Sequence, residues 1–212
     1  MILDEGIKLS GAPAIIEDCL RTELPGFLVR QGFKVGAEIG VYKGAFSEIF
    51  CKSGIERVYS IDPWQSYDGS GRSQKVQERQ DFLYAHTQRT LEPFPNSQII
   101  RKTSMNALED FEDNSLDFVY IDGNHSFPYV AQDIYEWSRK VRSGGIVSGH
   151  DYFDTSPTST NLLCHVRVVV DAYTRLFKIE NWWLFGKERV RPGSSYHIGR
   201  DDRFYSWMWF KP

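Results

Sequence analysis

The sequence predicts an α/β fold in which a mostly parallel sheet is covered by helices on both faces. Apolar segments of strand length alternate with segments of helical periodicity along the 212 residues, and parallel strands require such crossover helices. Seven strands are expected, and the last two have no helix between them, so the final strand should run antiparallel. Because no repeat or low-complexity tract interrupts the pattern, we expect one domain over residues 1–212.

The N-terminal segment, residues 1–32, is expected to be helical. Apolar residues from Ala14 to Gln31 stand at mixed helical spacing, and "LPGF" interrupts them. This pattern indicates one broken helix or two short ones.

The core is expected over residues 33–177, with an antiparallel strand pair over 178–212. Its strands are apolar runs, whereas its helices show apolar residues three and four apart, and Gly54 ends the first of them. The expected strands are 33–41, 57–62, 97–103, 116–122, 144–152, 178–186 and 202–211, and the expected helices are 43–54, 74–91, 128–141 and 161–177.

Composition and charge narrow the class of protein. Hydrophobic residues make up 41% and charged residues 25% of the chain, as in a soluble globular protein, and the net charge of -3 without a basic run argues against a nucleic-acid partner. The cysteines Cys19, Cys51 and Cys164 are odd in number and widely spaced, which favours neither disulfides nor structural zinc. With no leader-like or membrane-spanning run, we expect a cytoplasmic protein without a membrane partner; a homo-oligomer is compatible with the sequence.

The first two core strands end in residues suited to a nucleoside, and ligands of open α/β sheets bind beyond such ends. Glu38, Gly40 and Gly44 surround a tight turn, where glycines let a ligand approach the backbone. Asp62, at the end of the second strand, can accept both hydroxyls of a ribose. Val41 and Tyr42 occupy the turn between Gly40 and Gly44, and their bulk suits a nucleoside better than a pyrophosphate, although glycine turns at strand ends are common.

Further candidates follow the other strands. Ser104 and Met105 come after the third strand and could flank an adenine edge, or equally be a helix cap and a core side chain. Asp122 ends the fourth strand, and His150 with Asp151 ends the fifth. If those strands are neighbours, the carboxylates converge, which costs free energy unless a cation or a proton is present.

The stretch "IDGNHSF", residues 121–127, admits two interpretations. Its Asp, Gly, Asn and Ser residues are turn formers, and Ser126 could cap a helix whose first turn tolerates Pro128. Alternatively, Asp122 and His125 perform chemistry together with Asp151. Because several strand ends supply suitable residues at once, we favour the catalytic interpretation on a turn backbone.

The motifs "EIGVYKG", "YSID", "DFVYIDGNHSF" and "GGIVSGHDY" together resemble class I S-adenosylmethionine-dependent methyltransferases. The last two resemble the subgroup of macrocin-type sugar O-methyltransferases and cephalosporin-hydroxylase-like proteins. The resemblance covers about residues 33–177 and implies a Rossmann-like, doubly wound seven-stranded sheet with the last strand antiparallel. It further implies a cofactor site for S-adenosylmethionine. In that site, Glu38 and Gly40 would hold the methionine end, Asp62 the ribose, and Ser104 and Met105 the adenine.

The resemblance also implies a divalent metal, magnesium in the relatives, which here would be held by Asp122 and Asp151. His150 is expected as a third ligand, although it departs from the relatives' second acid and an imidazole suits zinc, iron or nickel better than magnesium. Alternatively, His150 could pack without coordinating. His125 stands where catechol O-methyltransferase relatives have a lysine base, and a neutral histidine can accept a proton at pH 7.

We therefore expect a metal-assisted O-methyltransferase that acts on a hydroxyl of a small molecule, with a sugar or glycosylated metabolite favoured by the resemblance. Four aromatic residues beside the expected site could stack on such an acceptor; they are Trp64, Tyr67, Tyr152 and Phe153. Loops 63–73 and 153–160 could close over it.

Two other classes share parts of this pattern. An NAD-dependent oxidoreductase would use the same sheet and Asp62, but the third glycine of its loop is missing. A non-catalytic nucleoside-binding scaffold would keep the cofactor pocket without turnover, and the set of Asp122, His125 and Asp151 argues against it.

Overall fold

The computed structural model describes residues 2–65, 74–155, 164–186 and 204–212. Its strands are β1 (Ala14–Ile15), β2 (Val35–Ile39), β3 (Arg57–Ile61), β4 (Ser97–Ile100), β5 (Leu116–Ile121), β6 (Val141–Tyr152), β7 (Trp183–Phe185) and β8 (Tyr205–Phe210). Its helices are α1 (Ile2–Gly6), α2 (Leu24–Arg30), α3 (Ala45–Lys52), α4 (Gln74–Leu91), α5 (Ser104–Ala107), α6 (Phe127–Lys140) and α7 (Val166–Leu176), with short 3-10 turns η1 (Arg21–Glu23) and η2 (Leu108–Asp110).

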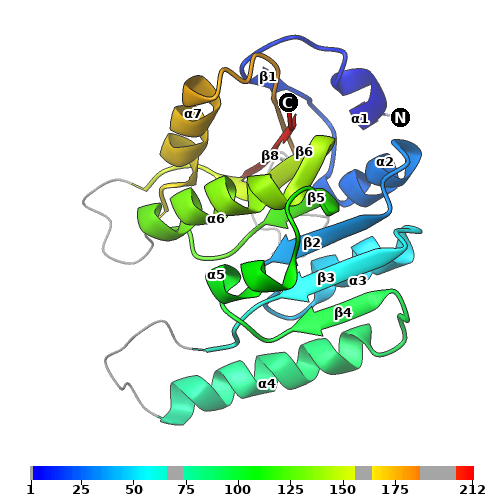
Figure 1. The fold of residues 1–212 in the computed structure, drawn as a ribbon, viewed down its shortest axis with the longest axis vertical. Coiled ribbons are helices and arrows are strands. Elements are labelled where there is room, and N and C mark those ends of the chain that lie inside the picture. Colours follow the sequence, from blue (N-terminus) through cyan, green and yellow to red (C-terminus); the bar gives the residue numbers. More distant parts are fainter. Residues whose placement is uncertain (1, 66–73, 156–163, 187–203) are drawn as a thin grey trace, which may run out of the picture.

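The described strands form one sheet in the order β1-β7-β8-β6-β5-β2-β3-β4 (Figure 1). All neighbours are parallel except β8, which is antiparallel to both β6 and β7. The predicted α/β class, with a mostly parallel sheet and an antiparallel last strand, is confirmed.

The expected strand count of seven is wrong, because the described sheet has eight strands. The additional strand, β1, comes from the segment expected to be entirely helical. Only Ala14 and Ile15 form it, and they pair with Trp183 and Leu184 at the sheet edge. Two residues are too few to show the period-2 alternation by which a strand is recognised.

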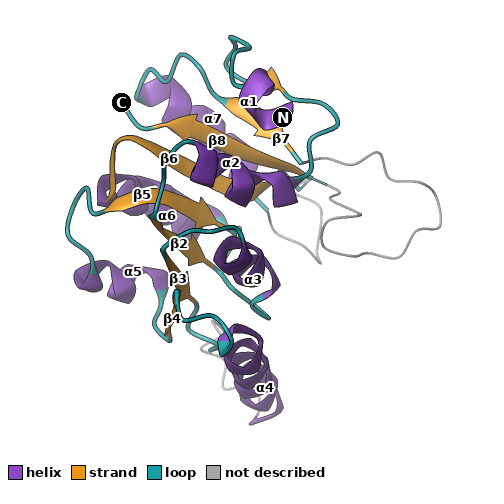
Figure 2. Ribbon diagram, turned by 90° about the vertical axis from the view of Figure 1, so that its right-hand side faces the viewer, coloured by secondary structure: helices purple, strands orange, loops and turns teal. Residues whose placement is uncertain are grey.

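Helices cover both faces of the sheet (Figure 2). One apolar cluster joins the sheet to α1, α2 and α3 through side chains such as Leu3, Phe27 and Phe50. A second cluster joins the other face to α6 and α7 through side chains such as Trp137 and Val170. No helix in the described part of the chain is both long and apolar enough to span a membrane.

The sheet has a switch point between β2 and β5. From β2 the chain passes to β3 and β4 on one side, and it then returns to place β5 on the other side of β2. Since these four strands are parallel, their carboxyl ends open at one edge, where a crevice forms between the diverging loops. The candidate site lies at this edge.

Candidate active site

A cleft of about 560 Å³ opens at the carboxyl ends of β2, β3, β4 and β5. Five residues predicted from the sequence line it, and they come from four separate strand ends: Gly40, Asp62, Ser104, Met105 and Asp122. The structure therefore brings together most of the expected cofactor residues, as the switch point requires.

The turn after β2 depends on Gly40 and Asp62. Gly40 has φ +89°, and a Cβ there would overlap the carbonyl of Asp122 and lie 2.6 Å from Cα of Gly123. The Asp62 carboxylate accepts hydrogen bonds from the backbone N–H groups of Val41 and Tyr42, both at 3.0 Å. Asp62 thus holds the turn in shape while its side chain also lines the cleft.

Glu38 and Gly44, which we expected to contact the cofactor, lie outside the cleft lining. Glu38 is 2% exposed and accepts a hydrogen bond from the hydroxyl of Ser47, which in turn accepts one of 2.7 Å from Ser60. Burial raises the pKa of Glu38 to about 8, although the bond from Ser47 opposes this. Gly44 adopts φ +79° directly before α3, so both residues support the turn from below.

Asp133 is a cleft residue that the sequence reasoning missed. It is 4% exposed, lines the cleft from α6, and accepts a hydrogen bond from the hydroxyl of Ser104. Ser104 also accepts a bond of 2.7 Å from the indole N–H of Trp137. Burial raises the pKa of Asp133 to about 7. A sequence signal existed, since an acid on the apolar face of a helix must meet a polar partner.

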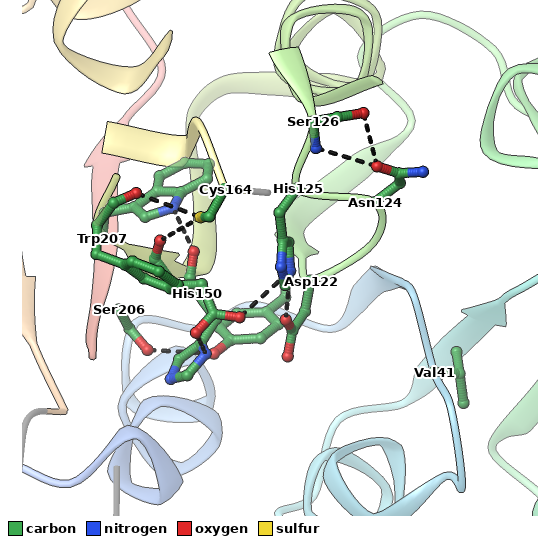
Figure 3. A network of polar contacts seen from close by, with 12 residues as sticks. Val41, Asp122, Asn124, His125, Ser126, His150, Cys164, Ser206 and Trp207 are labelled. Atoms are coloured by element: carbon green, nitrogen blue, oxygen red, sulfur yellow. Dashed lines mark hydrogen bonds and ion pairs between the residues drawn. The ribbon is translucent and has the colours of Figure 1, made fainter. Parts of the chain in front are cut away.

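Next to the cleft, Asp122, His125 and Asp151 form a cluster in which one potential ligand atom from each lies within 4.8 Å of the others. His125 Nε2 is 3.5 Å from Asp122 Oδ1 and 3.2 Å from Asp151 Oδ2. Figure 3 shows the side chains of His125 and Asp122 pointing toward each other. Because Asp122 belongs to both the cleft and the cluster, the two are continuous.

The cluster changes the acidity of its histidine. Burial alone would lower the pKa of His125, but its contact with the Asp122 carboxylate and the charges of Asp122 and Asp151 outweigh burial, so the pKa is raised. The two neighbouring carboxylates therefore favour the protonated form of His125.

The backbone aims Asp151 into the cluster. The β6–β8 register shifts between Gly149 and Tyr152, and Asp151 itself has φ +55°. Bulges of this kind redirect side chains beside active sites. His150, expected as a metal ligand, does not join the group of ligand atoms; its Nδ1 lies 3.2 Å from Asp151 Oδ1. Burial opposes ionisation of Asp151, but the bond from His150 and the nearby charges keep its pKa below the usual value.

The stretch 121–127 is a turn in backbone terms, as the simpler interpretation held. The Asn124 side-chain oxygen accepts bonds from the N–H and the hydroxyl of Ser126, which stands at the N-cap of α6. His165, before α7, donates its N–H to the carbonyl of His125 at 2.8 Å. The turn and this contact fix the position of His125.

The structure describes three of the four aromatic residues expected to stack on an acceptor, and their rings lie away from the cleft. Trp64 is fully buried against Val41 and Leu83, which removes its ring from the cleft. Tyr152 donates its hydroxyl to Asp171 at 2.6 Å, and Phe153 stacks on Phe204 with ring centroids 3.7 Å apart. None of these three rings lines the cleft. Tyr67, most of loop 63–73 and most of loop 153–160 lie outside the described residues.

A family model described as a methyltransferase domain matches residues 37–152, more than half of the 212 residues. A curated relative, the uncharacterized protein y4gI of Sinorhizobium fredii, is 28% identical over 120 residues, which is 54% of this chain and 12% of that protein. The chain therefore spans only a small part of that relative.

Two solved structures share the fold. The O-methyltransferase of Bacillus cereus in complex with SAH has a TM-score of 0.58 at 15% identity, over 90% of this chain and 80% of that chain. The O-methyltransferase TomG of Streptomyces achromogenes, involved in tomaymycin synthesis and solved with SAM, has a TM-score of 0.56 at 13% identity, over 91% and 80%. At these identities the likeness shows a Rossmann-like methyltransferase fold, as predicted.

Proposed function

The chain belongs to the methyltransferase-domain family, and from that premise we propose that it transfers a methyl group from S-adenosylmethionine to a hydroxyl of a small molecule. The observation that carries the proposal is the continuity of the nucleoside-sized cleft with the Asp122–His125–Asp151 cluster. A cofactor bound in the cleft would present its methyl group next to a base and two carboxylates. An NAD-dependent oxidoreductase offers no explanation for that cluster.

We assign the cofactor's ribose to the Asp62 side of the cleft and its adenine to the side of Ser104, Met105 and Asp133. Asp62 keeps acceptor capacity beyond its backbone bonds, because an ionised carboxylate has about four lone-pair sites. Met105 is a partly buried, polarisable side chain suited to contact with an aromatic base.

Asp122 and Asp151 are assigned as the carboxylate ligands of a divalent cation. The fit is good in spacing and chemistry, because the two half-buried carboxylates each offer an oxygen within 4.8 Å of the other, next to the His125 imidazole. Magnesium, expected from the resemblance, prefers oxygen ligands such as these two carboxylates, whereas an imidazole suits zinc, iron or nickel better. Such a cation would lower the pKa of the acceptor hydroxyl.

His125 is assigned as the base. The hydroxyl oxygen forms a bond to the methyl carbon, the carbon–sulfur bond breaks with its electron pair going to sulfur, and the hydroxyl proton passes to His125. His150 holds Asp151 in orientation through their contact. The acceptor that we propose, a sugar or glycosylated metabolite, rests on the motif resemblance alone.

A screen for methyl transfer tests the proposal. Labelled S-adenosylmethionine is incubated with sugars, nucleotide sugars and catechols, with EDTA and with Mg²⁺ or Mn²⁺ restored. If a sugar hydroxyl is labelled and EDTA abolishes the labelling, the result would support the whole assignment. Methyl transfer that is insensitive to EDTA would show that the reaction needs no divalent cation. Cofactor binding without transfer to any acceptor would favour a non-catalytic domain.

A further inference from the structure

A buried arginine from outside the family match reaches the active-site carboxylates. Arg21, in η1, is 3% exposed, and its Nη1 lies 3.6 Å from Asp122 Oδ2. We propose that Arg21 is a built-in cation of the site, which competes with a divalent cation for Asp122. The inference rests on the proposed function only in taking Asp122 as a cation ligand.

The guanidinium of Arg21 is surrounded by acids. Besides its contact with Asp122, its charge favours the ionised forms of Glu38 and Asp151 and so acts to lower the pKa of each. It also lies over the ring of Phe46, with Cζ 5.1 Å from the ring centroid. A buried guanidinium among carboxyl groups is the arrangement in which a fixed charge has the most effect, since water screens it least.

Close packing fixes the position of Arg21. The backbone N–H of Gly186 donates to the carbonyl of Cys19 at 2.8 Å, and a Cβ on Gly186 would lie 3.1 Å from Cβ of Arg21. The Leu20 N–H donates to the side chain of Glu23 at 3.3 Å. The segment around η1 and the end of β7 therefore fix the position of Arg21 jointly. Both segments lie outside the family match at residues 37–152.

The chemical consequence concerns Asp122, whose two oxygens face different cations. Oδ1 faces His125 and Oδ2 faces Arg21. A divalent cation that binds Asp122 must approach a fixed positive charge, so its affinity is reduced by the repulsion. Removal of that charge should therefore tighten cation binding. If Arg21 had a purely structural role, its removal would weaken cation binding or leave it unchanged.

The test measures Mn²⁺ affinity by electron paramagnetic resonance for the full chain and three variants. We expect Arg21→Met to bind Mn²⁺ at least about tenfold more tightly than the wild type, and Arg21→Lys, which keeps the charge, to resemble the wild type. The matched control is Arg30→Met, because Arg30 pairs with Asp4 on the surface of the same N-terminal segment. Equal or weaker binding by a folded Arg21→Met, including no binding by either protein, would overturn the proposal.

Two further measurements keep the result interpretable. If Arg21→Met fails to fold by thermal unfolding, titration of the wild type with Mg²⁺ should shift the Arg21 side-chain Nε–H resonance, and an unmoved resonance at saturation would overturn the proposal. Binding of S-adenosylhomocysteine is measured separately. Its absence in the wild type would contradict the proposed function and leave the Mn²⁺ comparison intact.

Discussion

His125 shows how one side chain depends on its charged neighbours. Its Nε2 has a carboxylate oxygen at 3.2 Å and another at 3.5 Å, and these raise its pKa. A protonated His125 cannot accept a proton. A cation that offsets the charges of Asp122 and Asp151 would favour the neutral form of His125, which the proposed role as a base requires.

Substitution of His125 tests its role directly. We expect His125→Ala to reduce turnover by about a hundredfold or more while leaving the affinity for S-adenosylhomocysteine nearly unchanged, because His125 does not line the cleft. His86→Ala, on α4 and also outside the cleft lining, is the matched control. Normal turnover by His125→Ala would remove His125 from the catalytic role.

At the scale of single residues, sequence reasoning named Asp122, His125 and Asp151, which the structure brings together, and missed Arg21 and Asp133. Asp122 and Asp151 stand at strand ends, where motif spacing identifies them. Arg21 and Asp133 reach the same site from a 3-10 turn and a helix, and no local pattern connects them with the strand ends. His150 and Trp64 show the reverse error, since adjacency in sequence did not place their side chains in the site.

The elements were predictable where periodicity is strong. Helix α4 has the expected bounds, 74–91, and β5 begins at the expected Leu116. The bulge in β6 that turns Asp151 into the site leaves no sequence signal of its own. Pairing of β1 with β7 likewise depends on a contact between distant segments, which a window of neighbouring residues does not contain.

The junction of β2 and β5 gives a prediction at the scale of elements. We expect Gly40→Ala to destabilise the fold by about 1–3 kcal/mol beyond the strain of a positive φ, because the new methyl group would overlap the backbone of Asp122. Gly32→Ala is the control, since Gly32 has φ +80° with nothing within 4 Å of the added Cβ. Urea unfolding measures both, and equal losses of stability would show that the close approach is unimportant.

The molecule as a whole keeps buried acids under its active site, and this makes its stability depend on pH. Burial raises the pKa of Glu38 to about 8 and that of Asp133 to about 7. The folded state therefore binds more protons than the unfolded state between about pH 4 and pH 8. The stabilisation by these two groups is largest at a pH below their pKa values in the unfolded state. It is lost as the pH rises through their pKa values in the folded state.

Replacement of Glu38 separates its share of this effect. Between pH 5 and pH 8, we expect the free energy of unfolding to fall less for Glu38→Gln than for the wild type. The dependence on pH that remains in the variant is expected from Asp133. Glu56→Gln is the control, because Glu56 forms a surface ion pair with Lys34 and both side chains are more than 60% exposed. Thermal unfolding across this pH range measures the difference, and parallel curves for wild type and Glu38→Gln would contradict the raised pKa.

Four expectations stay predictions from the sequence: the cytoplasmic location, the absence of a nucleic-acid partner, the homo-oligomer and the single-domain organisation. The macrocin-type subgroup is likewise a prediction, because the family match covers the methyltransferase core and leaves the acceptor open.

The central claim is that the cleft binds S-adenosylmethionine, and calorimetric titration tests it most directly. S-adenosylmethionine, S-adenosylhomocysteine and NAD are titrated into the protein with and without Mg²⁺. We expect both S-adenosyl compounds to bind at one site per chain and NAD not to bind, since the bulk of Val41 and Tyr42 in the turn after Gly40 disfavours a pyrophosphate. Binding of NAD alone would contradict the account.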